Sequence, residues 1–100
     1  MQGTFTGTGR SASFTPRQGA AFNVSVWGTF SATVQMHRSF DNGVTWLPIT
    51  VGTTELYTWT GGTGVKYSEI AAEPMPGVLY SLECDPYTSG TVNYLMGQAQ

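Results

Sequence analysis

Hydrophobic and polar residues alternate along most of the chain with a period of two. The clearest example is the run FNVSVWG at residues 22–28, and similar runs occupy 32–37, 78–84 and 91–96. A period of two places successive side chains on opposite faces of a β-strand, so each run predicts a strand with one face in a core. No segment of useful length shows the 3.6-residue period of an amphipathic helix. The pattern therefore predicts an all-β protein.

Turn-forming residues separate these runs and divide the chain into short strands. Glycine, proline, asparagine and aspartate cluster at 18–19, 61–64, 73–77 and 85–90. Seven or eight strands at this spacing favour a two-sheet antiparallel β-sandwich, immunoglobulin-like with seven strands or a jelly roll with eight. We expect residues 11–100 to form this sandwich and residues 1–10 to be an extended N-terminal arm or an edge strand.

The strongest local signal is the octet SFDNGVTW at residues 39–46. An Asn-Gly pair favours a tight hairpin turn with positive φ at both residues. Ser39, Asp41 and Thr45 carry oxygens that can bond backbone N–H groups of the loop, and Trp46 can cover the hairpin as an apolar lid.

The octet has the form S-x-D-x-G-x-T-W. It resembles the Asp-box of sialidases and other β-propellers, and matches it at the five defining positions Ser39, Asp41, Gly43, Thr45 and Trp46. The resemblance covers these eight residues alone, and in that family the box stabilises a turn away from the active site. It therefore implies a structural turn here.

Charged residues are unusually sparse. They make up 10% of the 100 residues, with a formal net charge of −2, whereas a typical soluble domain has about 25%. A surface of this kind is poorly protected against association, which suits a protein packed into an assembly. A β-protein kept soluble by its serine and threonine hydroxyls fits the composition equally well. Four cations in an acidic chain do not make the basic stripe that nucleic-acid binding needs.

Cysteine usage and hydropathy bear on the compartment. Cys84 is the single cysteine, so no intrachain disulfide can form. No apolar segment has the form of a signal peptide, and none is long enough to span a bilayer. We therefore expect synthesis in a reducing cytoplasm and no membrane association.

Candidate chemistry is scarce. His37 is the only histidine, no second ligand stands at metal-site spacing, and no G-x-S-x-G motif occurs. Glu69 and Glu83 could be cross-strand neighbours, but like charges directly opposite each other are destabilising. We expect no catalytic residues, no metal and no cofactor, and hence no enzyme activity.

Aromatic residues are more numerous than one small core can hold. Three roles stay open for them: filling the core or capping loops, anchoring a protein interface, and stacking on sugar rings. The candidate interface residues are Phe5, Trp27, Tyr57, Trp59 and Tyr87.

Three segments together resemble small structural proteins of tailed-bacteriophage heads. They are VWGTF at 26–30, RSFDNGVTW at 38–46 and YTSGTVNY at 87–94. Decoration or cement proteins of that kind are β-sandwiches or jelly rolls that clamp the outside of the capsid as dimers or trimers. The resemblance implies a non-enzymatic virion protein, assembled in the host cytoplasm and located on the capsid surface. Its partners would be the major capsid protein or another virion protein, and copies of itself.

Two alternatives remain at this level. A carbohydrate-binding module of a phage tail or secreted protein would need Trp27, Trp59 or Tyr87 exposed and coplanar on one face. An immunoglobulin-like accessory domain of a tail would need the matching strand order.

Overall fold

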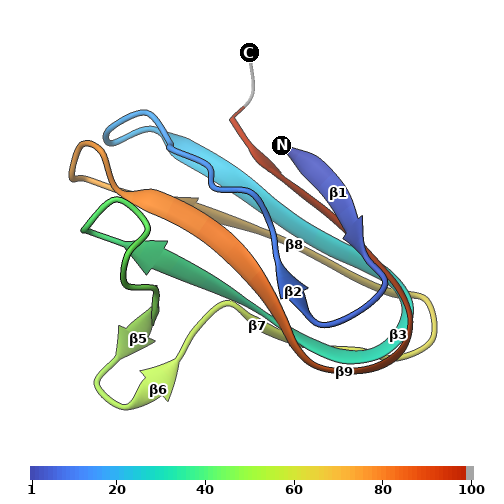
Figure 1. Ribbon diagram of the computed structural model, residues 1–100. Helices are drawn as coiled ribbons and strands as arrows, with labels where there is room; N and C mark the ends of the chain where they lie inside the picture. The colour runs from blue at the N-terminus through green and yellow to red at the C-terminus, as the bar shows by residue number, and fades with distance from the viewer. Residues whose placement is uncertain (99–100) are drawn as a thin grey trace.

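The computed structural model describes residues 1–98, and within them the chain forms nine β-strands and no helix. The strands are β1 (Gln2–Phe5), β2 (Gly9–Arg10), β3 (Ala21–Ser39), β4 (Leu47–Pro48), β5 (Thr50–Val51), β6 (Thr54–Glu55), β7 (Thr58–Thr60), β8 (Val65–Ala72) and β9 (Leu79–Gly97). Seven of them form one antiparallel sheet, and β5 and β6 form a separate small hairpin (Figure 1). The predicted all-β, antiparallel fold is confirmed.

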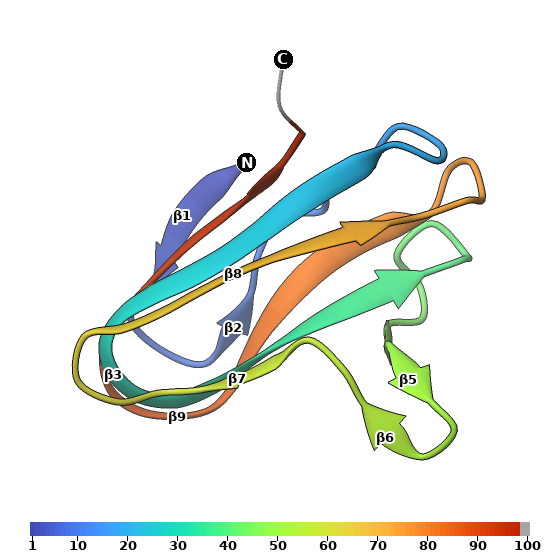
Figure 2. The same cartoon turned by 180° about the vertical axis from the view of Figure 1, so that it is seen from behind.

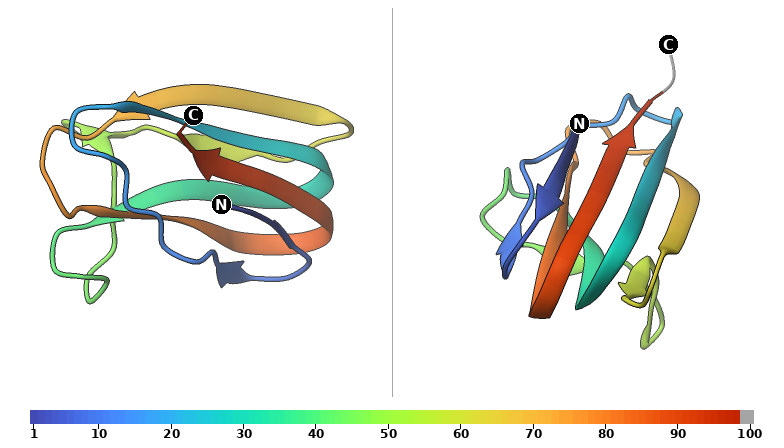
Figure 3. Two further views of the ribbon diagram at one scale, coloured as in Figure 1. Left: turned by 90° about the horizontal axis from the view of Figure 1, so that it is seen from above. Right: turned by 90° about the vertical axis from the view of Figure 1, so that its right-hand side faces the viewer.

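The two 19-residue strands, β3 and β9, are the centre of the sheet. They pair with each other from Asn23↔Gly97 to Ser39↔Leu79. Both bend sharply near their middles, so the two halves of the sheet fold toward each other (Figures 1 and 2). One half has the order β1-β9-β3-β8, seen side by side in the right panel of Figure 3, and in the other half β9 pairs with β2 and β3 with β4 and β7.

This architecture corrects the predicted strand boundaries. The runs 22–28 and 32–37 were expected as separate strands, but both lie in β3, and the expected turn at 85–90 lies inside β9. The turn-forming residues there bend the strand pair without reversing the chain. Register shifts on either side of Ala32 absorb the bend. The layers expected as two sheets are thus joined into one.

Glycines permit the bend because the two backbones nearly touch there. Gly28 has φ +137°, and a Cβ on it would lie 2.5 Å from the carbonyl oxygen of Thr91. Gly90 has φ +92°, and a Cβ on it would lie 2.4 Å from the carbonyl oxygen of Thr29. A side chain at either position would collide with the opposite strand in a backbone conformation that favours glycine.

The core lies between the two halves of the sheet. Phe22, Val24 and Val26 face it, as the alternation predicted. Phe22 from one half meets Tyr80 from the other edge-on, with ring centroids 4.9 Å apart. The remaining buried apolar side chains are Phe5, Phe30, Ala32, Val34, Met36, Trp59, Val78, Leu82, Cys84, Val92, Tyr94 and Met96.

Residues 1–10 are part of the sheet. β1 pairs with the end of β9, β2 pairs with an earlier part of β9, and Phe5 packs against Tyr94 at 4.8 Å. Across the opposite edge, the Trp59 indole N–H donates to Glu69, and the Tyr67 hydroxyl donates to the Thr60 carbonyl at 2.7 Å. These contacts link β7 to β8 and so connect the two halves of the sheet.

Candidate functional site

The octet at residues 39–46 forms a tightly bonded turn between β3 and β4. The buried Ser39 hydroxyl donates to Asp41 Oδ1 at 2.7 Å and accepts the Gly43 N–H at 2.8 Å. Asp41 Oδ1 also accepts the Thr45 N–H at 2.8 Å. The hydrogen bond from the Thr45 backbone N–H, followed by those from the Thr45 and Ser39 side chains, lowers the pKa of Asp41 to about 2. The turn is therefore held by the carboxylate form of an exposed aspartate.

The backbone of the turn has the form that the Asn-Gly pair indicates. Asn42 has φ +61° and Gly43 has φ +88°. The Trp46 ring lies beside the turn, since a Cβ on Gly43 would be 3.7 Å from it. The guanidinium of Arg10 covers the same ring, with Cζ 4.9 Å from the ring centroid. Trp46 is thus enclosed between the turn and β2.

Exposed apolar side chains gather on this turn and on the segment that follows it. Among residues 1–98, eight large hydrophobic side chains are exposed, and five of them lie within 40–56. We call these five the apolar loop surface: Phe40, Val44, Leu47, Val51 and Leu56. Val44 is the most exposed, at 83%. This segment carries the β5–β6 hairpin, which projects from the sheet in Figure 2.

A chain of polar contacts crosses the outer face of the sheet beside this segment. Arg10 Nη2 donates to Glu83 at 3.0 Å and lies 3.1 Å from His37 Nδ1. His37 Nε2 lies 2.8 Å from Gln35 Oε1, and the Gln35 amide donates to Glu55 on β6. The chain therefore runs from β9 through β2 and β3 to the projecting hairpin.

The contacts of His37 define its tautomer. A guanidinium has donors only, so Nδ1 accepts from Arg10 and Nε2 carries the hydrogen given to Gln35. Burial lowers the pKa of His37, the Arg10 charge lowers it further, and Glu83 and Glu55 oppose this. Both ring nitrogens are occupied, so this arrangement provides no free base beside a nucleophile.

The five candidate interface residues are distributed over the molecule. Trp27 is 38% exposed on the outer face of β3, and Tyr57 and Tyr87 are half-buried. Phe5 and Trp59 lie in the core, Trp59 with 3% of its surface exposed. Tyr57 and Trp59 have ring centroids 6.4 Å apart, and the Tyr87 hydroxyl donates to its own strand at Gly90. Core burial explains two of the aromatics that the sequence left unassigned.

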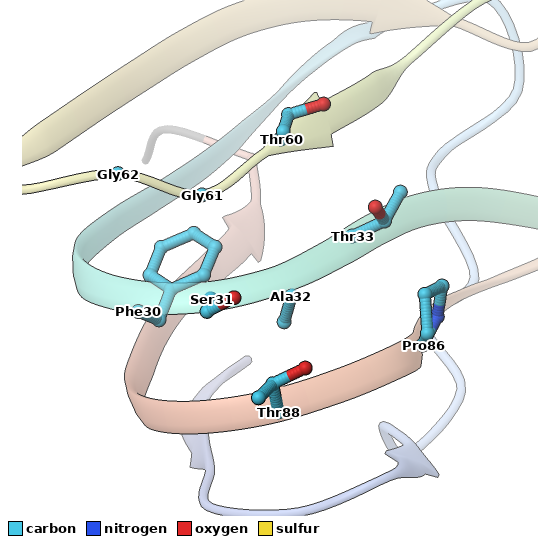
Figure 4. Close-up of a pocket in the computed structure, with 9 residues that line it drawn as sticks. All are labelled: Phe30, Ser31, Ala32, Thr33, Thr60, Gly61, Gly62, Pro86 and Thr88. Carbon is cyan, nitrogen blue, oxygen red and sulfur yellow. The ribbon is translucent and has the colours of Figure 1, made fainter.

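A shallow groove at the bend was missed by sequence reasoning because its residues are far apart in the chain. It has a volume of about 330 Å³. Figure 4 shows hydroxyl side chains of Ser31, Thr33, Thr60 and Thr88 around it, with Pro86 at one end. Its lining contains no titratable side chain, so it offers hydrogen bonds but no acid or base.

Residues 1–98 contain no group of three or more histidine, cysteine, aspartate or glutamate side chains placed to hold a metal ion. No helix of residues 1–98 is long and apolar enough to cross a membrane.

The apolar loop surface and the partners of His37 were also missed. The members of the apolar loop surface stand in and after the turn motif, so their apolar character was visible in the sequence, but their exposure was not. Arg10 and Glu83 are 73 positions apart and meet only in the fold. In comparisons with known proteins, the chain matches no family model, no curated protein and no solved structure.

Proposed function

We propose that the protein is a non-enzymatic structural protein of a phage virion that binds the outer surface of the capsid. The observation that carries this proposal is the apolar loop surface on residues 40–56. Five of the eight large hydrophobic side chains exposed among residues 1–98 fall on this one stretch of chain. Exposed apolar side chains that gather in one region favour a protein-binding surface, whereas scattered ones need no explanation. The partner would be the major capsid protein or another virion protein.

The segment is held in place before any partner arrives, which supports this role. Ser39 and Asp41 fix its start, and β4 pairs with β3 through His37↔Pro48. The Leu56 N–H donates to the Ile49 carbonyl at 2.8 Å, which closes the hairpin. A pre-ordered loop loses less conformational entropy on binding than a mobile one, so more of its contact energy contributes to affinity.

The fold suits a structural protein that holds neighbouring capsid subunits together. We group it with small two-layer β-sandwiches of the jelly-roll or immunoglobulin-like kind, because the core lies between two facing halves of one sheet. We also propose that the protein works as a dimer or trimer. Analytical ultracentrifugation tests this, and a monomer at all concentrations would contradict it.

The carbohydrate-binding alternative is weaker. It needs exposed aromatic rings on one face, but Trp59 is in the core and the Tyr87 hydroxyl bonds to Gly90. Of the three rings that this alternative named, Trp27 is the most exposed, at 38%.

Co-sedimentation with purified phage heads that lack this protein tests capsid binding. The variant pair Val44→Asp and Val51→Asp places charge in the apolar loop surface, and we expect binding to fall at least tenfold. Ile70→Asp is the matched control, since Ile70 is 73% exposed on β8, outside this segment. Equal losses in the control, or no binding by the wild-type protein, would reject the proposal.

A further inference from the structure

The contact between His37 and Arg10 has a chemical consequence that depends on one proton. His37 is 7% exposed, and its Nδ1 accepts from Arg10 Nη2 at 3.1 Å. The same Nη2 atom donates to Glu83 at 3.0 Å. The guanidinium that these two contacts position also lies over the Trp46 ring. His37 thus helps to hold the group that covers Trp46.

Protonation removes this arrangement. An imidazolium carries hydrogens on both nitrogens, so Nδ1 would point a hydrogen at a cation that can only donate. The charged groups around His37 are Arg10 on β2, Glu83 on β9 and Glu55 on β6. Glu83 is the acceptor beside Nη2. A protonated His37 can therefore take the place of Arg10 on that carboxylate.

We propose that His37 is an acid-sensitive catch. In its neutral form it keeps the Arg10 guanidinium over Trp46. On taking a proton from solvent it replaces Arg10 on the Glu83 carboxylate, so the guanidinium leaves the Trp46 ring and the indole is uncovered. Trp46 directly precedes Leu47, a member of the apolar loop surface. Uncovering the ring exposes a further apolar side chain on this stretch of chain, and we expect mild acid to strengthen docking. This effect on docking rests on the proposed function, whereas the catch itself does not.

The catch is tested on the free protein. Incorporation of 5-fluorotryptophan gives three ¹⁹F signals, from Trp27, Trp46 and Trp59, which are assigned with single Trp→Phe variants. Between pH 7.5 and 4 we expect the Trp46 signal to shift along the same curve as the His37 ring carbon. Broadening of that signal by a soluble gadolinium chelate should at least double. The Trp27 and Trp59 signals report that the fold is intact.

Two variants make the test specific. In His37→Gln, which cannot titrate, the Trp46 signal should stay flat over this range. In Arg10→Gln at pH 7.5, where the fold is not under acid stress, Trp46 should already show the broadening of the acid state. A Trp46 signal that is unchanged in Arg10→Gln, or that ignores His37 titration in the wild type, would overturn the proposal.

The two proposals fail separately. If the catch operates but heads are not bound at any pH, the proposed function alone is rejected. If heads are bound equally at pH 7.5 and pH 5 while the free protein shows no change at Trp46, the catch alone is rejected.

Discussion

The hydroxyl of Tyr80 donates a hydrogen bond of 2.8 Å to the carboxylate of Glu73, which is 3% exposed. The same carboxylate accepts the Met75 N–H at 3.1 Å and lies 3.6 Å from Arg38. Burial raises the pKa of Tyr80 to about 12, and the hydrogen bond and charge of Glu73 add to this. One side chain thus holds the 73–77 connection against the core.

Glu73→Ala should lower the free energy of unfolding by roughly 2–4 kcal/mol, because it leaves the Tyr80 hydroxyl and the Met75 N–H without their acceptor. Tyr80→Phe, which removes the hydroxyl and keeps the ring, should cost about 1 kcal/mol. Urea denaturation followed by circular dichroism measures both. Equal costs for the two variants would show that the carboxylate has no role beyond the tyrosine bond.

Gly90→Ala should destabilise the protein by about 2–4 kcal/mol, because the added Cβ meets the Thr29 carbonyl in a backbone conformation with positive φ. Gly7→Ala is the control, since a Cβ there meets nothing within 4 Å. The difference in melting temperature between the two variants is the measurement. A control as unstable as Gly90→Ala would mean that the close approach at the bend is unimportant.

Acid should weaken the turn at Asp41. Its folded pKa of about 2 lies below the ordinary value of 3.8, so the unfolded chain binds more protons between these values. The stability that the carboxylate contributes is therefore complete above about pH 4, and is lost as pH falls toward 2. Asp41→Ala should melt at a lower temperature at pH 7 and lose less on acidification than the wild type. Melting curves at pH 7, 4 and 2 decide it; parallel losses in both proteins would contradict this.

Cys84 should be unreactive in the native protein. Its side chain is fully buried, and burial followed by the charge of Asp85 raises the pKa of the thiol. Thiol reagents need the thiolate and access to it, so reaction requires unfolding. We expect labelling in water to be slower than in urea by a factor of roughly 10³ or more. Rapid labelling of folded protein would place Cys84 near a mobile edge.

Sequence reasoning predicted what depends on neighbours in the chain. The alternation around Val24 gave the inward face, and the octet gave a turn whose bonds run from Ser39 and Asp41 to residues at most four positions away. It failed where distant segments decide the outcome. Gly28 ended a predicted strand and Gly90 stood in a predicted turn, yet each is needed because the opposite backbone approaches it.

The same limit applies to the site. Exposure of Trp59 could not be judged from the sequence, because its burial depends on β7 facing the other half of the sheet. The covering of Trp46 by Arg10 joins residues 36 positions apart. The apolar residues in and after the octet were a usable signal for an interaction surface. Valine and leucine side chains in and just after a turn motif are less able to reach a core than those in the middle of a strand.

Because β3 and β9 are bent, no boundary between separate sheets divides the two layers of this molecule. Each of these strands crosses from one layer into the other, so neither layer can come away while its partner stays intact. Heat, denaturant or mechanical pulling should therefore meet one all-or-none barrier, and the protein should resist load up to a threshold and then unfold completely.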